Sequence, residues 1–427
     1  MRAMKDSGIE WIGAIPQDWE LRKIKTNFDI IAGATPKSGE ASFWDGDIPW
    51  ITPADYTTEG IYVSAGHKSI THDGLNSCAT SLIPEGSIIF SKRAPVGLVA
   101  INSNPLCTNQ GCLSCVPKDL VDAKYFYYVM SIYGEQFDLF ASGTTFKEIS
   151  ADAFANFKLP YPDFETQKQI ASFLDTKCAE IDALIAAKEK TNALLKERRQ
   201  SIIYEAVTKG LDPTAPMKDS GVEWIGKIPE RWSVTKIGFL FNTIGSGTTP
   251  TSSDGSYYDG EYNWLQTGDL NDSIIETTEK TITDLAIKNY SVLNCYSVGS
   301  LVIAMYGATI GKLGILGVPC YTNQACCVLD DPQNADTKYV YYWLLGYRQV
   351  LINLSLGGGQ PNISQSIIRS FRVCLPPKNE QEAIAKELDN EVSSLDHIMK
   401  QNKKTIQLLK EYRQSLIYEA VTGKIEL

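Results

Sequence analysis

Almost the whole chain is a tandem repeat, and this feature constrains the fold more than any other. The segment MKDSGIEWIGAIPQDW at 4–19 returns as MKDSGVEWIGKIPERW at 217–232, and KERRQSIIYEAVTKG at 196–210 returns as KEYRQSLIYEAVTGK at 410–424. Shorter matches between these ends keep a spacing of about 213 to 214 residues. The sequence therefore predicts two structural halves that are built on one plan.

The two halves match unevenly. Their arms and helix ends are nearly identical, whereas the middles at 20–160 and 233–376 agree only at scattered positions. We infer that the near-identical parts do the same work twice and that the divergent parts do two different tasks.

Composition indicates a folded, acidic protein. The 427 residues are 43% hydrophobic and carry a formal net charge of −10. This length suits two to four domains, and the charge argues against a protein that coats nucleic acid by bulk charge. No apolar run reaches the roughly 18 residues of a membrane span, and the N-terminus lacks the apolar core of a signal peptide. We therefore expect a cytoplasmic protein with no membrane partner.

Changes of pattern divide the chain into six segments. Two of them alternate short β-type runs with turn residues, which predicts α+β domains, the first with a helix at about 121–140. Two others lack Pro and Gly over some 45 residues and predict long helices. The segments are an arm (1–19), a first domain (20–162), a first helix (163–208), a linker with the repeated arm (209–232), a second domain (233–377), and a second helix with the C-terminal tail (378–427).

Heptad patterns in the long helices predict helix-on-helix packing. In the first helix, one predicted line is Ile170, Lys177, Leu184, Thr191 and Arg198, and the other is Leu174, Ile181, Lys188, Leu195 and Ile202. In the second helix, the lines are Ile384, Glu391, Ile398, Thr405 and Tyr412, and Leu388, Leu395, Asn402, Leu409 and Leu416. A helix of about 45 residues spans roughly 65 Å and cannot bury its stripe alone. We therefore expect an antiparallel coiled-coil pair.

The sequence shows no constellation for catalysis or metal binding. Cys112 and Cys115 form one CxxC without a second pair, and the chain has only three histidines. A structural zinc site needs four regularly spaced ligands, so free thiols are expected. The segment 307–313 approximates a phosphate loop, but it has three residues between the glycines and a leucine after the lysine. We expect a non-catalytic chain with no metal and no cofactor.

The whole architecture resembles the specificity (S) subunit of type I restriction–modification systems. The resemblance covers nearly the full chain, and each motif is weak by itself. The motifs are IDALI at 181–185, the helix ends at 198–210 and 412–424, the strand-and-loop segments Gly86–Gly97 and Gly299–Gly311 with the Thr-Asn-Gln that follows each, and the segments from Gly143 and Gly359 that lead into Gln167 and Gln381.

This resemblance implies two target-recognition domains on an antiparallel helical spacer. Each domain would read one half of a bipartite double-stranded DNA target, and the spacer would set the gap between the halves. Two copies of a separate adenine methyltransferase (M) subunit would dock on the spacer and arms. Restriction (R) subunits, which translocate DNA, join the complex in systems that contain them.

Candidate DNA-binding residues are polar or basic side chains in the loops after the central strand and before each long helix, because such side chains contact base edges and phosphates. In the first domain they are Ser91, Lys92, Arg93, Thr144, Thr145 and Lys147, with Trp50 and Thr52 behind them. In the second they are Tyr306, Thr309, Lys312, Gln360 and Asn362, with Gln266 and Thr267. Ordinary loop polarity is the alternative for each. Asn109-Gln110 and Asn323-Gln324 occur in both halves and are interpreted as framework.

Neither predicted domain is basic. Residues 20–160 hold 11 basic and 15 acidic residues, and residues 233–376 hold 8 and 11. We therefore expect weak DNA binding by the isolated chain, with the methyltransferase subunits supplying much of the phosphate contact. The main alternative is a coiled-coil scaffold that gathers protein partners and never reads DNA, and an enzyme with an unrecognised site is a third hypothesis.

Overall fold

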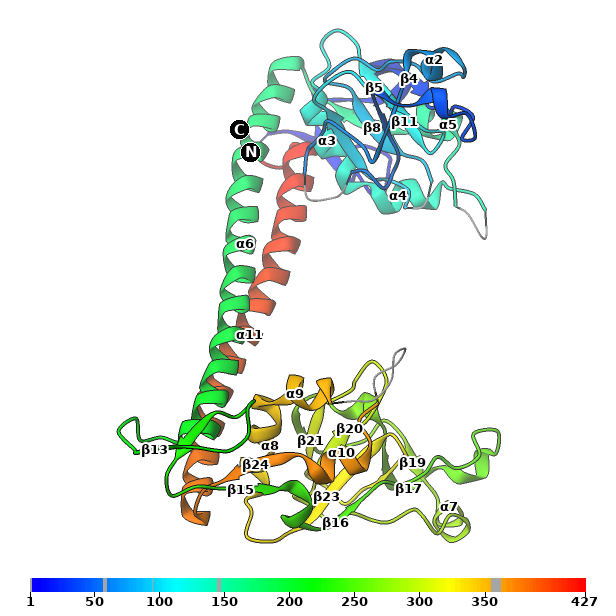
Figure 1. The fold of residues 1–427 in the computed structure, drawn as a ribbon. Coiled ribbons are helices and arrows are strands. Elements are labelled where there is room, and N and C mark those ends of the chain that lie inside the picture. The colour runs from blue at the N-terminus through cyan, green and yellow to red at the C-terminus, as the bar shows by residue number, and fades with distance from the viewer. Residues whose placement is uncertain (1, 57–59, 94, 144–146, 355–361) are drawn as a thin grey trace. The chain divides into compact units, whose positions relative to one another are not determined.

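The computed structural model describes residues 2–56, 60–93, 95–143, 147–354 and 362–427 (Figure 1). The chain forms two compact units. Unit 1 contains Met1–Lys188 and Lys404–Leu427, and unit 2 contains Glu189–Lys403. Each unit combines one α+β domain with parts of both long helices, so the repeat in the sequence is also a repeat in space.

The domain of unit 1 is built on a mixed five-stranded sheet in the order β4-β11-β8-β9-β6. Its neighbours pair antiparallel except for β6 and β9, which are parallel. These strands are β4 (Phe28–Ala32), β6 (Tyr62–Val63), β8 (Ile88–Ser91), β9 (Val99–Asn102) and β11 (Cys112–Pro117). A second sheet has the order β10-β5-β7, from β5 (Trp44–Ile51), β7 (Lys68–Ile70) and β10 (Cys107–Thr108). Strands β3 (Glu20–Lys23) and β12 (Lys158–Tyr161) pair at the ends of the domain.

Short helices cover these sheets: α1 (Ile24–Asn27), η1 (Ala41–Phe43), α2 (His72–Asn76), α3 (Ala123–Ile132), α4 (Gly134–Leu139) and α5 (Ala151–Asn156). The helix predicted at about 121–140 is thus two helices, because the chain leaves helical geometry at Tyr133 (φ −102°, ψ 21°). Tyr133 is buried in the core, so packing of its ring holds the break.

The domain of unit 2 repeats this topology. Its five-stranded sheet has the order β16-β23-β20-β21-β18, and its three-stranded sheet has the order β19-β17-β22. The strands are β16 (Phe241–Gly245), β17 (Tyr258–Leu265), β18 (Ser273–Ile275), β19 (Thr281–Ile282), β20 (Leu301–Ala304), β21 (Leu313–Leu316), β22 (Tyr321–Thr322) and β23 (Cys326–Pro332), with β15 (Ser233–Lys236) paired to β24 (Arg372–Leu375). The helices are η2 (Ile237–Phe239), η3 (Gly255–Tyr257), η4 (Thr267–Asp269), α7 (Asp284–Asn289), α8 (Thr337–Gly346), α9 (Arg348–Asn353) and α10 (Gln365–Ser370). Two divergent sequences therefore keep one backbone plan.

Each repeated arm is a small antiparallel hairpin. Strands β1 (Met4–Asp6) and β2 (Ala14–Pro16) pair in unit 1, and β13 (Met217–Asp219) and β14 (Lys227–Pro229) pair in unit 2. Ile12, Ile15 and Trp19 are buried in the core of unit 1, and the Tyr418 hydroxyl donates to the Ile12 carbonyl at 3.0 Å. The arm thus packs its apolar side chains against the domain and the end of a long helix.

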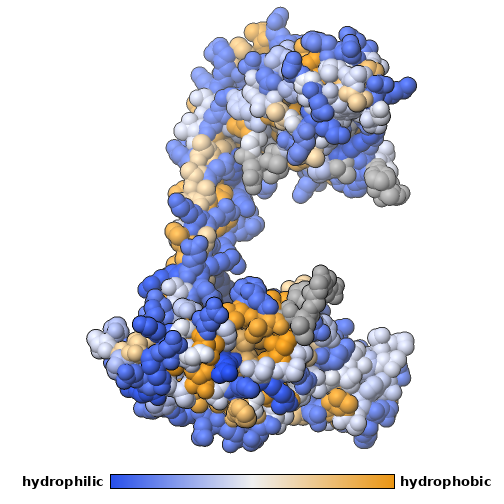
Figure 2. Space-filling model, viewed as in Figure 1, coloured by the Kyte–Doolittle hydropathy of each residue, from blue (hydrophilic) through white to orange (hydrophobic). Residues whose placement is uncertain are grey.

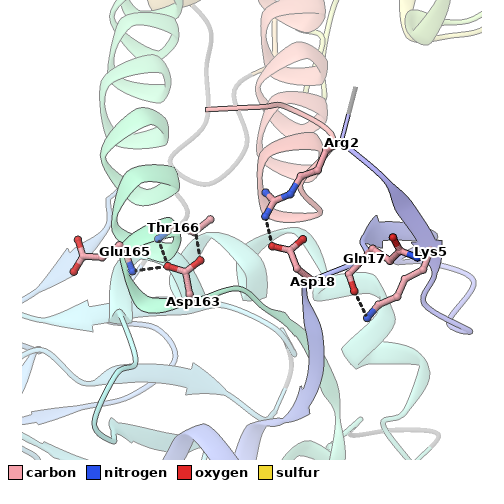
Figure 3. A network of polar contacts seen from close by, with 7 residues as sticks. All are labelled: Arg2, Lys5, Gln17, Asp18, Asp163, Glu165 and Thr166. Atoms are coloured by element: carbon pink, nitrogen blue, oxygen red, sulfur yellow. Dashed lines mark hydrogen bonds and ion pairs between the residues drawn. The ribbon is translucent and has the colours of Figure 1, made fainter.

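Polar contacts stabilise the arm of unit 1, and others stabilise the start of its first long helix (Figure 3). Arg2 forms an ion pair with Asp18, and the Lys5 ammonium donates to the Gln17 carbonyl at 2.9 Å. Asp163 accepts hydrogen bonds from the hydroxyl and backbone of Thr166, which satisfies free N–H groups at the helix start. These bonds hold the pKa of Asp163 below its usual range.

The two long helices are α6 (Phe164–Lys209) and α11 (Lys378–Val421). In unit 2, Asn192 bonds Asn402 at 3.0 Å and Arg199 pairs with Asp396 at 3.1 Å, so numbering rises along one helix as it falls along the other. The helices are therefore antiparallel. Unit 1 contains the equivalent ion pair, from Arg413 to Asp182 at 3.0 Å. No helix among the described residues is long and apolar enough to cross a membrane.

In each long helix, one of the two predicted heptad lines is displaced by one residue from the seam, which is the surface along which α6 and α11 pack on each other. The lines through Leu174 and Leu388 lie in the seam, but Leu184 and Ile398 of the other lines are 53% and 41% exposed. The true partner lines are Ala171, Cys178, Ile185, Asn192, Arg199 and Ala206 in α6, and Ala385, Val392, Met399, Ile406, Arg413 and Ala420 in α11. Sequence periodicity missed them because these lines include amide and guanidinium groups that pair across the seam.

Candidate nucleic-acid interface

Three segments of the first domain meet where its central strand β8 ends. The Lys92 backbone N–H donates to the Gly111 carbonyl at 2.9 Å, and the Lys92 carbonyl accepts from the Ile149 N–H at 3.0 Å. Arg93 forms an isolated antiparallel bridge with Glu148. The loop after β8 therefore lies between the turn that follows β10 and the segment that precedes α5. The structure brings together the two groups of candidates that the sequence predicted for this domain.

The basic candidates on this surface are paired with acids of the same domain. Glu148 Oε1 lies 2.9 Å from Lys92 Nζ, and Glu148 Oε2 lies 2.8 Å from Arg93 Nε. Lys147 pairs with Asp138. Hydrogen bonds from Lys92 and, to a smaller extent, from Arg93 hold the pKa of the Glu148 carboxyl below its usual range. A DNA phosphate at this surface would have to compete with these carboxylates.

Three other candidates of the first domain shape the backbone instead of pointing into solvent. Ser91 is fully buried, with its hydroxyl 2.8 Å from the Arg93 carbonyl. The Trp50 indole N–H donates to the Ala34 carbonyl at 3.0 Å. The backbone N–H and the hydroxyl of Thr52 both donate to Asp55 Oδ2, at 2.7 Å each.

The second domain presents different side chains on the same backbone frame. The Met305 N–H donates to the Ala325 carbonyl at 2.8 Å, and the Met305 carbonyl accepts from the Ile363 N–H at 2.7 Å. Tyr306 forms the bridge with Asn362 that Arg93 forms with Glu148 in the first domain. A charged trio in one domain thus corresponds to a neutral pair in the other.

The remaining candidates of the second domain lie in two nearby turns. The Gln266 N–H donates to Asp269 Oδ2 at 2.8 Å, and Gln266 and Thr267 begin the turn η4. The Lys312 N–H donates to the Thr309 carbonyl at 2.9 Å, in the loop between β20 and β21. The candidates Thr144, Thr145 and Gln360 lie outside the described residues.

Sequence reasoning missed Glu148. A single glutamate in a loop has no periodicity to mark it, yet the repeat held a signal, because Glu148 is the equivalent of the candidate Asn362. Its significance depends on two ion pairs that only the folded domain forms.

The described residues contain no group of three or more His, Cys, Asp or Glu that could hold a metal ion. Cys112 and Cys115 are both buried in strand β11. Burial raises the pKa of the Cys112 thiol to about 12 and raises that of Cys115 as well. Protonated, buried thiols are poor metal ligands.

A duplicated α+β domain on an antiparallel helix pair, with polar side chains gathered at equivalent loops, defines a class of two-domain recognition proteins. The family model described as "Type I restriction modification DNA specificity domain" matches residues 16–196 and 229–408, one match in each half. The chain belongs to this family. It is a DNA specificity subunit with two recognition domains.

Full-length relatives agree with the family match. The chain is 29% identical to the type I restriction enzyme MjaIX specificity subunit of Methanocaldococcus jannaschii, over 97% of this chain and 95% of that one. It is 24% identical to the type I restriction enzyme EcoBI specificity subunit of Escherichia coli, over 98% of this chain and 89% of that one.

Solved structures share the fold. One, described as the "structural basis underlying complex assembly and conformational transition of the type I R-M system", has a chain that matches with a TM-score of 0.76 at 16% identity, over 96% of this chain and 99% of that one. The HsdS subunit from Thermoanaerobacter tengcongensis matches with a TM-score of 0.55 at 14% identity, over 96% and 98%.

Proposed function

We propose that the two domains read the two halves of a bipartite double-stranded DNA target and that the helices fix the gap between them. The proposal is based on a shared backbone frame that holds unlike side chains in the two domains. The first domain presents Lys92, Arg93 and Glu148 at this frame, and the second domain presents Tyr306 and Asn362. Base edges are read by side chains of these types. The same scaffold with different readers suits one complex that recognises two unlike half-sites.

The functional modules in this proposal have the bounds expected from the sequence. They are the arm (1–19), recognition domain 1 (20–162), spacer helix 1 (163–208), linker and repeated arm (209–232), recognition domain 2 (233–377), and spacer helix 2 with the tail (378–427). The chain itself does no chemistry. It directs a complex that acts on DNA in the cytoplasm.

Two methyltransferase (M) subunits dock on equivalent parts of the helices in this proposal. Leu184 and Leu408 in unit 1 are 53% and 54% exposed, and their repeat equivalents Ile398 and Leu194 in unit 2 are 41% and 56% exposed. Figure 2 shows apolar side chains among polar ones along the helices. Large apolar side chains that recur at matched exposed positions favour two binding sites for one protein. Restriction (R) subunits would join the resulting methyltransferase core.

A methylation map tests the reading function. The chain is co-expressed with its methyltransferase in a host that lacks other adenine methylation, and methyladenine is located by sequencing. A two-part motif with a fixed gap is the expected result. A stable complex with the methyltransferase that leaves the DNA unmethylated would contradict the proposal and favour a protein scaffold.

Single substitutions test the docking sites. Leu184→Asp and Ile398→Asp should each reduce the number of bound methyltransferase copies from two to one, as measured by native mass spectrometry. Leu139→Asp is the matched control, because Leu139 is 79% exposed and ends helix α4 of the first domain instead of belonging to a long helix. Two copies bound to every variant would refute these sites.

A further inference from the structure

Gln110 and Gln324 are exposed glutamines that the fold holds in the same way in both domains. The Thr35 hydroxyl donates to Gln110 Oε1, and the Thr249 hydroxyl donates to Gln324 Oε1 at 2.7 Å. The two residues joined by each bond lie 75 residues apart in the sequence. Neither Nε2 atom donates a hydrogen bond to another described residue. Each side chain is thus oriented by its oxygen and keeps two amide N–H donors for an external acceptor.

Close backbone packing builds this arrangement. A Cβ atom at Gly33 would lie 2.1 Å from the Asn109 carbonyl oxygen, and one at Gly247 would lie 1.8 Å from the Thr322 carbonyl oxygen. Glycine at these two positions lets the segment that follows β4 or β16 and carries the threonine approach the turn that carries the glutamine. The repeat preserves both the glycine and the threonine at the same spacing.

In each domain, the turn that carries the glutamine lies between the loop after the central strand and the end of β5 or β17. In the first domain, the Asn109 N–H donates to the Ile51 carbonyl at 2.9 Å, directly before Thr52, and the Gly111 carbonyl accepts from Lys92 at 2.9 Å. In the second domain, the Asn323 N–H donates to the Leu265 carbonyl at 3.1 Å, and the Ala325 carbonyl accepts from Met305 at 2.8 Å. A DNA duplex that contacts the loop after β8 or the loop after β20 therefore lies next to this turn.

The neighbouring asparagines show what a framework residue looks like in the same turn. Asn109 Oδ1 accepts from the Gly111 N–H at 2.9 Å, and Asn323 Oδ1 accepts from the Ala325 N–H at 3.0 Å. Asn323 is only 9% exposed. The asparagines therefore act within the turn, whereas the glutamines next to them face outward with donors to spare.

We propose that Gln110 and Gln324 bind DNA phosphate oxygens through their Nε2 donors and so position both half-sites by one sequence-independent contact. This inference rests on the proposed function. A phosphate contact ignores the base, so domains that read different sequences can share it, and glutamine side chains are among the groups that hold phosphates. In this proposal the two glutamines, which the sequence analysis interpreted as framework, also contact DNA directly.

The test uses the complex with methyltransferase and measures its affinity for a cognate duplex and an unrelated duplex at several salt concentrations. Gln110→Ala and Gln324→Ala should each weaken binding to both duplexes by about 10-fold, because each loses a hydrogen bond to a charged acceptor. The methylated motif and the thermal midpoint should not change. Gln333→Ala is the matched control, since Gln333 is exposed at the opposite end of β23 from Gln324.

Lysine substitutions separate a phosphate contact from other roles. Gln110→Lys should restore affinity and make the slope of log K against log [salt] more negative by about 1, because a lysine at a phosphate releases one more counterion. Several results would overturn the proposal: unchanged affinity of the alanine variants, a methylation motif altered at one base, or a lowered thermal midpoint with no rescue by lysine.

Two outcomes separate this inference from the proposed function. If the unsubstituted complex does not distinguish the two duplexes, the proposed function fails. If the unsubstituted complex is specific and the variants bind DNA as it does, only this inference is refuted.

Discussion

Replacing Glu148 with glutamine should release two cations at the first recognition surface. Glu148 pairs with Lys92 Nζ at 2.9 Å and with Arg93 Nε at 2.8 Å. The trio carries a net charge of +1, and Glu148→Gln raises it to +2 with almost no change of shape. Because a carboxylate and a phosphate compete for the same donors, the wild-type domain has to break these ion pairs to use both cations on DNA.

Counterion release gives the size of the effect. Each additional phosphate neutralised on duplex DNA steepens the slope of log K against log [salt] by about 0.9. When the salt concentration rises from 50 to 200 mM, one extra phosphate contact should therefore make the affinity of the variant fall roughly 3.5-fold more than the affinity of the parent falls. At low salt, the variant should bind every duplex more tightly and discriminate less between cognate and unrelated sequences.

Fluorescence anisotropy of the methyltransferase complex on labelled duplexes measures these slopes. Glu165→Gln is the matched control, because Glu165 pairs with Lys168 at 2.9 Å on helix α6, away from the loops of the recognition surface. Its salt slope should equal that of the parent. A Glu148→Gln slope equal to that of the parent would refute the reasoning that these cations meet phosphates.

Four further predictions follow from the packing, the seam and the charges. Gly247→Ala should destabilise unit 2 by more than about 2 kcal/mol in chemical unfolding, whereas Gly255→Ala, with open space around its Cβ, should stay within about 0.5 kcal/mol; equal effects would contradict the clash. Asn402→Leu should cost about 1–3 kcal/mol by removing the partner of the Asn192 amide, and the double leucine variant should recover most of that loss; no recovery would contradict the assignment of this cost to the broken amide pair. One heptad inserted into each long helix adds about 10.5 Å, so the gap in the methylation motif should grow by about three base pairs; an unchanged gap would rule out the spacer role. Because the folded pKa of Glu148 lies below the ordinary value, its stabilising effect relative to Glu148→Gln should be present above the ordinary glutamate pKa and disappear as pH falls through the folded value; a stability difference that persists in acid would contradict this.

The repeat made most of the architecture predictable. The antiparallel helix pair, the two α+β domains and the two similar arms all follow from segments that recur at one spacing. The heptad pattern was less reliable, because Leu184 and Ile398 look like core residues and are exposed. Conversely, Asn192 and Arg413 look like surface residues but lie in the seam, where each has a partner on the other helix.

The candidate site was only partly predictable. The loops were found because each follows a buried central strand, yet polarity alone could not separate buried Ser91 from exposed Arg93. The acid that binds Lys92 and the threonine that orients Gln110 lie 56 and 75 residues away from them. Contacts over such distances depend on strand register and close backbone packing, which composition and periodicity do not encode.

Duplication of one recognition domain shows whether each domain reads one half of the target. Residues 20–162 are replaced by a second copy of residues 233–377, and the methylation map is compared with that of the parent. Because the two helices run antiparallel, we expect an inverted repeat of the parent's second half-site, with the parent's gap. A motif that keeps the parent's first half-site would contradict the claim that each domain reads one half of the target.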